Sequence, residues 1–301
     1  MSTINSFYRD PNAVAYASQL FSGSSPAKPT TTTNTGHSPS DRGTVSDSAG
    51  QRALARIIEI LSLGDGGSAD QADVSESLGY ITSVSGTDGN DSLTFTGRGV
   101  YQVETGNGDD SLVAKSAAMA GISLGDGKDS LKASATLLSE IDGGAGDDDI
   151  QLTGSLIMTV TGGDGNDTIK ASGDTLANID GGAGDDIMYL EGSRFFASGG
   201  TGNDKVTIHQ KPGSNSVAEY AFAAGDGQDT ITTDGPLSLQ LGGFQQGDIT
   251  VTASTNSLIL TFAGSSDKMT VTFDGAAAKG STPSFAFANQ DGYLTLQIKP
   301  A

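Results

Sequence analysis

Eight aspartates of this chain recur at the same place in a glycine-rich nonapeptide. The pattern is Gly-Gly-x-Gly-(Asn/Asp)-Asp, then a spacer, an aliphatic residue and one further residue, and its clearest copy is GGDGNDTIK at residues 162–170. Its copies begin at residues 86, 105, 124, 143, 162, 181, 199 and 224. A glycine-rich turn can direct several backbone carbonyls at one point, and an adjacent carboxylate adds negative charge; hard divalent cations take oxygen ligands of both kinds. The repeat therefore predicts calcium sites.

The candidate ligands occupy the sixth and fourth positions of each copy. The sixth-position residues are Asp91, Asp110, Asp129, Asp148, Asp167, Asp186, Asp204 and Asp229, and the fourth-position residues are Gly89, Gly108, Gly127, Gly146, Gly165, Gly184, Gly202 and Gly227. One turn supplies fewer oxygens than the six to eight that Ca²⁺ takes, so each ion is expected between two stacked turns. Eight turns leave seven gaps, which predicts about seven Ca²⁺ ions. Without them the stacked aspartates repel one another, so calcium is expected to drive folding.

The spacing of the copies predicts the elements that hold these turns. It is 19 residues between the first six copies, then 18 and 25, and a period this regular is typical of a solenoid. In each coil the eighth position is always apolar, from Leu93 to Ile231, and the fifteenth and eighteenth positions are apolar in the regular coils. We therefore expect an all-β fold: a parallel two-sheet β-roll, or β-solenoid, of about eight 19-residue coils. Its strands stack about 4.8 Å apart and enclose an apolar core.

Only one of the two turns in each coil is acidic. The second turn carries small and hydroxyl residues, and its few acids, Asp174 and Glu191, are isolated. The carboxylates are therefore expected along one edge of the stack, with a single row of ions. The six extra residues before the last copy, near 211–215, fall in the second turn and should bulge there without disturbing the acidic edge.

The composition outside the repeat predicts four segments. Residues 1–50, rich in Ser, Thr, Pro and Gly, are expected to be a disordered leader, and residues 51–85 a capping helix (51–63) followed by a degenerate first coil. Residues 86–236 are expected to form the calcium-binding roll. Residues 237–301 are expected to form an antiparallel β cap, with strands at 249–252, 258–262, 269–273 and 293–298.

The bulk composition excludes several classes of function. A formal charge of −20 argues against binding to nucleic acid or to an anionic membrane surface. The absence of cysteine excludes disulfides and thiolate metal sites. No apolar run is long enough to span a membrane, and the first 20 residues lack the basic and apolar segments of a cleavable signal peptide.

The nonapeptide resembles that of the RTX, or haemolysin-type, family of secreted bacterial calcium-binding proteins. The resemblance covers roughly residues 86–232 and rests on all eight copies. It implies a calcium-bound parallel β-roll, ligands from the sixth-position Asp and from carbonyls of the first four positions, and secretion through an uncleaved C-terminal signal. The chain departs from the family in its period, because the usual repeat returns every nine residues and places calcium on both edges. Thr87 and Lys128 also replace usual motif residues.

No catalytic residues are expected. Ser123 lies in a Gly-x-Ser-x-Gly sequence, but other coils place Glu, Asp or Thr at that position, and no His-Glu-x-x-His stretch exists. We therefore expect a secreted, non-enzymatic calcium-binding protein that acts as a binding or adhesion scaffold for an unknown protein or polysaccharide. Two alternatives remain open: an effector exported by a type III system, or an accessory module of an extracellular enzyme.

Overall fold

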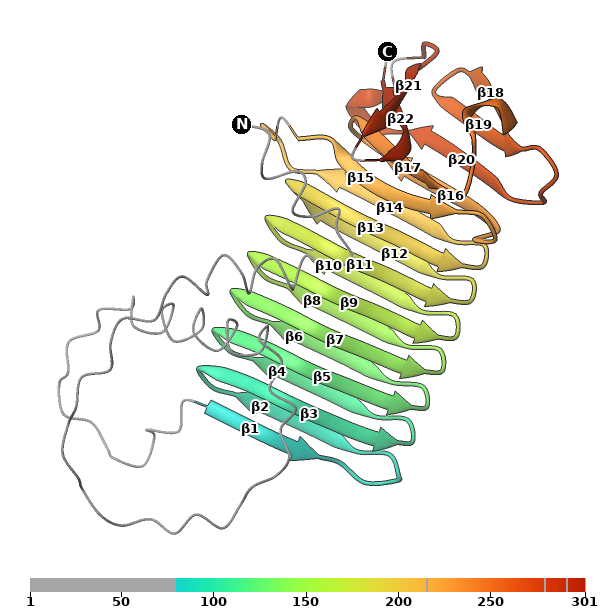
Figure 1. The fold of residues 1–301 in the computed structure, drawn as a ribbon. Coiled ribbons are helices and arrows are strands. Elements are labelled where there is room, and N and C mark those ends of the chain that lie inside the picture. Colours follow the sequence, from blue (N-terminus) through green and yellow to red (C-terminus); the bar gives the residue numbers. More distant parts are fainter. Residues whose placement is uncertain (1–79, 215, 279, 291, 301) are drawn as a thin grey trace, which may run out of the picture. The chain divides into compact units, whose positions relative to one another are not determined.

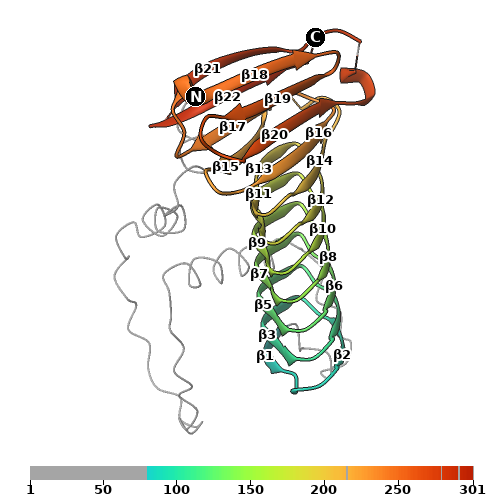
Figure 2. The same cartoon turned by 90° about the vertical axis from the view of Figure 1, so that its right-hand side faces the viewer.

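The computed structural model describes residues 80–300 apart from positions 215, 279 and 291. These residues belong to one compact unit, 71–301. They form two sheets packed face to face in a rod, as Figures 1 and 2 show from two sides. The all-β, two-sheet solenoid expected from the repeat is confirmed. The predicted leader (1–50), the helix (51–63) and most of the degenerate coil lie outside the described residues.

Each sheet has eleven strands, and the chain alternates between the sheets through the regular coils. The first sheet contains, in spatial order, β1 (Tyr80–Ser85), β3 (Gly99–Asn107), β5 (Ala118–Asp126), β7 (Leu137–Ala145), β9 (Leu156–Asp164), β11 (Thr175–Ala183), β13 (Arg194–Thr201), β15 (Ala218–Ala223), β17 (Leu237–Gly242), β22 (Tyr293–Lys299) and β21 (Ser284–Gln290). The second contains β18 (Ile249–Ser254), β19 (Ser257–Phe262), β20 (Lys268–Phe273), β16 (Gln228–Thr233), β14 (Lys205–Gln210), β12 (Ile187–Gly192), β10 (Thr168–Ser172), β8 (Asp149–Thr153), β6 (Ser130–Ser134), β4 (Ser111–Lys115) and β2 (Ser92–Thr96).

The repeat period sets the register of the parallel strands. Residues 19 apart face each other, as Thr168 does with Ile187 in β10 and β12. Between β11 and β13 the register shifts after Ala177, because the seventh copy follows the sixth by 18 residues and Asn178 has no partner. Side chains at equivalent motif positions therefore stack in rows that run along the rod.

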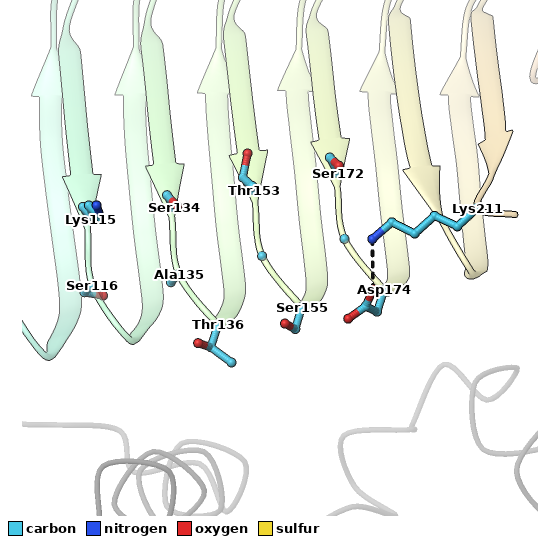
Figure 3. Close-up of a pocket in the computed structure, with 12 residues that line it drawn as sticks. Lys115, Ser116, Ser134, Ala135, Thr136, Thr153, Ser155, Ser172, Asp174 and Lys211 are labelled. Carbon is cyan, nitrogen blue, oxygen red and sulfur yellow. Dashed lines mark hydrogen bonds and ion pairs between the residues drawn. The ribbon is translucent and has the colours of Figure 1, made fainter. Parts of the chain in front are cut away.

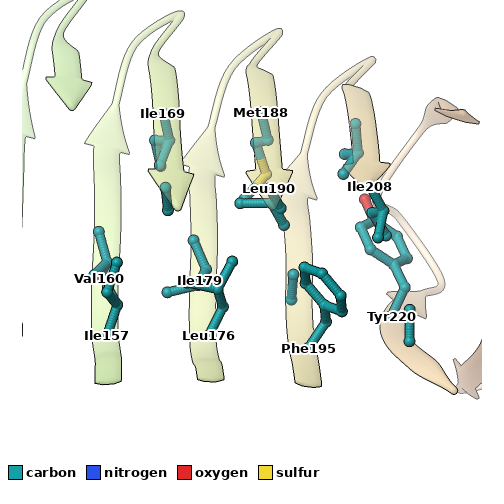
Figure 4. Packing of buried hydrophobic residues seen from close by; sticks show 14 of the residues in the cluster. Ile157, Val160, Ile169, Leu176, Ile179, Met188, Leu190, Phe195, Ile208 and Tyr220 are labelled. Carbon is teal, nitrogen blue, oxygen red and sulfur yellow. The ribbon is translucent and has the colours of Figure 1, made fainter. Parts of the chain in front are cut away.

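The apolar rows form the core between the two sheets. Eighth-position residues such as Leu112 and Ile169 are fully buried, and so are fifteenth- and eighteenth-position residues such as Ile157 and Val160. Figure 4 shows how these rows continue from coil to coil. Leu93, in the outer strand β2, is only partly buried. Since side chains alternate along a strand, the residues between these positions face outward.

The strands of the first sheet extend further than the sequence pattern predicts. We expect a turn over the first six motif positions, yet β9 continues through Gly162 and Gly163 to Asp164. The second- and fourth-position glycines have φ between +95° and +143° from the second copy to the last, a backbone conformation that side chains disfavour. A Cβ on Gly163 would also collide with the carbonyl oxygen of Gly144 in the preceding coil. Glycine is thus required at these positions for two reasons: the backbone has a positive φ, and the turns approach too closely to leave room for a Cβ.

The C-terminal residues extend the solenoid before they cap it. Strand β17 pairs in parallel with β15, and β20 pairs in parallel with β16, so both sheets continue beyond the last motif. Antiparallel strands then follow, with β18 and β19 beside β20, and β22 and β21 beside β17. The expected antiparallel cap is confirmed, whereas β21 is not predicted from the sequence. Two 3-10 turns, η1 (Gln246–Asp248) and η2 (Gly275–Ala277), interrupt this region.

Candidate metal centre

The eight motif turns stack along one edge of the rod. The first seven lie at the ends of first-sheet strands marked by the arrowheads of β1 to β13 in Figure 1, and the eighth follows β15. The structure therefore brings all eight predicted aspartates into one row. Seven of them, from Asp110 to Asp229, are at most 3 % exposed, and Asp91 at the start of the row is half-buried. An ionised carboxylate this deeply buried needs hydrogen bonds or a cation.

One oxygen of these carboxylates is used for stacking. The Oδ1 atom of each aspartate from Asp110 onward accepts a hydrogen bond from the backbone N–H of the sixth-position residue in the preceding coil, for example Asp129 N to Asp148 Oδ1 at 2.8 Å. The other six bonds of this ladder have N–O distances of 2.7–3.1 Å. The aspartate side chain thus couples each turn to the one before it.

The other oxygen has no partner in the six interior turns. The Oδ2 atoms of these turns are buried without a hydrogen bond in Asp110, Asp129, Asp148, Asp167, Asp186 and Asp204. The two ends of the row differ: Asp91 Oδ2 accepts bonds from Thr87 N (2.6 Å) and Thr87 Oγ1 (3.0 Å), and Asp229 Oδ2 accepts one from the Tyr220 hydroxyl (2.9 Å). A row of orphaned anionic oxygens is the arrangement that a bound cation would complete.

Backbone carbonyls surround the orphaned oxygens. A Cβ built on Gly143 would collide with both Asp148 Oδ2 and the carbonyl of Gly162 in the next coil, and Gly162 and Gly181 repeat this arrangement. The carbonyls of Gly144 and Gly146 face the next turn as well, because Cβ atoms on its second and fourth glycines would strike them. Each regular gap therefore contains one carboxylate oxygen beside one carbonyl oxygen, and two further carbonyls are directed at the next turn; hard divalent cations take oxygen donors of these kinds.

Two of the interior turns depart from this pattern at the first motif position. Thr105 and Leu124 stand there, both buried, in place of the glycine of the other regular copies. The Thr105 hydroxyl also donates to the carbonyl of Leu124, the oxygen that would otherwise face the gap. The gaps that follow Asp148, Asp167 and Asp186 therefore offer the most regular ligand sets.

A second ladder explains the Asn/Asp preference at the fifth position, which the sequence pattern alone leaves without a role. Each fifth-position Oδ1 accepts the backbone N–H of the same position in the next coil, as Asn166 Oδ1 does from Asp185 N at 2.8 Å. The equivalent bonds span 2.8–3.2 Å along the row. Lys128 carries no acceptor, so the ladder is interrupted between Lys128 and Asp147.

The buried row has an unusual affinity for protons. Burial raises the pKa of Asp148, Asp186 and Asp229 to about 7 and that of Asp204 to about 6. Hydrogen bonds from backbone N–H groups oppose this rise, while neighbouring carboxylates add to it. In the absence of a metal ion, protons are thus the available counter-charge for the row.

The opposite edge of the rod carries no comparable row. A shallow groove there is lined by Ser and Thr side chains and by glycines of successive turns, with Lys115 near one end and Lys211 near the other (Figure 3). Asp174, expected to be isolated, pairs with Lys211 Nζ at 2.9 Å. The extra residues near 211–215 connect β14 to β15 and so lie at this edge, as predicted.

Nowhere in the described part of the chain do three His, Asp or Glu side chains converge as a ready metal cluster. A cation on the acidic edge would therefore depend on one carboxylate per gap and on carbonyls. No helix among the described residues is long and apolar enough to cross a membrane. No family model matches the chain, and no curated protein matches it significantly.

The interrupted fifth-position ladder can be completed by substitution. Lys128→Asn supplies an acceptor for Asp147 N–H, and one more backbone hydrogen bond should stabilise the fold by ~0.5–1.5 kcal/mol, raising Tm by about 2–4 °C. Thermal unfolding followed by circular dichroism measures this. Lys132→Asn, which removes the same charge from an exposed position of β6, is the matched control and should not raise Tm. Equal Tm values for the two variants would contradict the ladder.

The raised pKa values predict how the calcium-free protein responds to pH. Because the folded-state pKa values of about 6–7 lie above the ordinary value of 3.8, the folded form binds more protons between these limits. Its stability is therefore greatest in mild acid and is lost as pH rises through about 7. Tm measured with a chelator should rise by several degrees from pH 7 to pH 5, the range over which protons take up the charge of the calcium-free row. Asp148→Asn should flatten this dependence, and an unchanged slope would contradict the assignment.

Proposed function

We propose that this chain is a calcium-binding repeat protein of the RTX type, whose β-roll folds on Ca²⁺ and then serves as a rigid, non-enzymatic scaffold for binding or adhesion outside the cell. The observation that carries the proposal is the row of six buried aspartate Oδ2 atoms without partners, three of which, in Asp148, Asp167 and Asp186, lie beside a glycine carbonyl of the next turn.

The ligands are assigned by position in the motif. In a regular gap, Asp148 Oδ2 and the carbonyls of Gly144 and Gly146 from one turn, with the carbonyl of Gly162 from the next, would hold the ion. Four protein oxygens are fewer than the six to eight that calcium takes, so each ion needs further oxygens to complete its shell. The bound ion supplies positive charge that neutralises the buried carboxylate and ties adjacent turns together.

The ion type follows from the same ligands. All of them are oxygens on flexible glycine turns, and calcium accepts such irregular shells more readily than Mg²⁺, which demands near-ideal octahedral geometry. With only one carboxylate in each gap the individual sites are weak, and sites of this kind fill where calcium is abundant, as it is outside cells. Weak sites along one stack become effective together because each ion stabilises the interface that the next ion needs.

Calcium removal is the direct test of this function. Chelation should lower β-sheet content in the far-ultraviolet circular dichroism spectrum and increase the hydrodynamic radius at pH 8, where protons no longer compensate the carboxylates. Millimolar calcium should restore both, whereas the same concentration of Mg²⁺ should restore less. A spectrum and radius that ignore both chelator and calcium would exclude a calcium-dependent roll.

Variants along the row should differ in calcium binding according to position. Asp148→Asn keeps the Oδ1 acceptor but removes the unpartnered anionic oxygen, so it should raise the calcium midpoint several-fold. Asp91→Asn should change it less, because Asp91 is half-buried and Thr87 already occupies its Oδ2. Asp174→Asn, on the opposite edge, is the control and should leave the midpoint unchanged. Calcium titrations followed by circular dichroism compare the three, and identical midpoints would contradict a single acidic row.

A further inference from the structure

The seventh gap, between the turns at 199–204 and 224–229, is built differently from the gaps before it. In the regular coils the two strands remain paired through the second motif glycine, as Gly163 and Gly182 do in β9 and β11. Between β13 and β15 the pairing covers only Phe196, Ala197 and Ser198 and ends before the glycines. The first half of the last turn is therefore not paired with the preceding turn.

The close contacts at the glycines show the same loss of stacking. A Cβ on Gly200 would collide with the carbonyl of Gly182, as in every regular gap, but a Cβ on Gly225 would meet no atom within 4 Å. The second half of the turn still stacks, since a Cβ on Gly227 would strike the carbonyl of Gly202. Thus the seventh gap lacks the contact at the second glycine, which is where one of the carbonyl ligands lies in the other gaps.

The hydroxyl of Tyr220 occupies the vacated space. It accepts a hydrogen bond from Gly199 N at 2.8 Å and donates one to Asp229 Oδ2 at 2.9 Å. A Cβ on Gly199 would meet this hydroxyl at 2.7 Å, whereas Gly143, Gly162 and Gly181 would meet a carbonyl of the following turn. The Tyr220 hydroxyl thus stands where a carbonyl of the following turn stands in the regular gaps, and its proton is directed at the carboxylate of Asp229.

The core is arranged to hold the tyrosine in this place. Tyr220 continues the row of eighteenth-position residues, through pairings of Val160 with Ile179, Ile179 with Ala197 and Ala197 with Tyr220. Its side chain is fully buried, and Figure 4 shows it in line with this row. Ala197, the smallest member of the row, lies directly beneath it. The 25-residue spacing before the last copy therefore coincides with a large residue, Tyr220, in a row where the preceding coils carry smaller apolar residues.

We infer that Tyr220 is a built-in plug that closes the seventh gap, so that the row of calcium ions ends before it and the chain binds at most six ions. This rests on the proposed function for the six earlier gaps. Asp229 takes its compensation from the phenol proton. Asp204, whose Oδ2 would serve the seventh gap by the assignment above, is left with the carbonyl of Gly202 as the one motif carbonyl that still contacts the next turn.

The experiment compares Tyr220→Phe with Tyr189→Phe, which removes a hydroxyl from a half-exposed ring. Tyr220→Phe should lower Tm by about 3–8 °C through loss of the bond to Asp229, and by the same amount in saturating calcium as in chelator, because the hydroxyl belongs to no ion site. Tyr189→Phe should leave Tm unchanged in both. An effect of Tyr220→Phe that appears only with calcium, or no effect, would overturn the plug.

Native mass spectrometry of the wild-type chain in calcium gives the ion count. A count of one to six ions supports the plug. Seven ions, or an ion between Gly199 and Gly225 in a crystal grown with calcium, would overturn it while leaving the proposed function intact. No bound calcium at all would refute the proposed function and the predicted end of the row together, whereas the calcium-free Tm comparison would still test the bond between Tyr220 and Asp229.

Discussion

The structure depends on how closely its glycine turns stack. Each turn approaches its neighbour so tightly that a Cβ at the second or fourth motif position of a regular turn would strike a carbonyl of the preceding coil. This contact excludes solvent from the aspartates, and the resulting burial raises the pKa values of several of them. The same geometry that aligns the strands thus creates a column of like charges that the fold must neutralise.

Two hydrogen-bond ladders keep this column ordered. At the sixth position the carboxylate binds the coil before it, and at the fifth position the side chain binds the coil after it. Every regular turn is therefore linked in both directions through side chains as well as through the strands. Since the sixth-position ladder uses only Oδ1, it leaves Oδ2 available, and the proposed calcium ions complete what the ladder leaves unsatisfied. Structure and proposed binding use different atoms of the same residue.

The repeat predicts the fold well because its constraints are periodic. The apolar rows, the register of 19 and the acidic edge all follow from residue types that recur, such as Ile150, Ile169 and Met188 in the core. Features that occur once are not predictable in this way. Nothing in the pattern indicates that Tyr220 reaches Asp229 across nine residues, or that Thr105 binds a carbonyl of the next turn, because each depends on local spacing of the backbone. The strand β21 is not predicted because Ser284–Gln290 carries only two large apolar residues, Phe285 and Phe287, and none of its residues is buried.

A periodic array must also end, and this chain ends its row of carboxylates with hydrogen-bond donors. At the first turn Thr87 replaces the usual glycine and donates to Asp91, and at the last turn Tyr220 donates to Asp229. Asp229 has no further motif turn after it to supply carbonyls, so it lacks the ligand set that the interior aspartates have. A neutral donor satisfies such a carboxylate without requiring a cation. The two ends of the row therefore share one device, a hydroxyl donor directed at the terminal carboxylate, and the Oδ2 atoms left without a donor are those of the six turns between them.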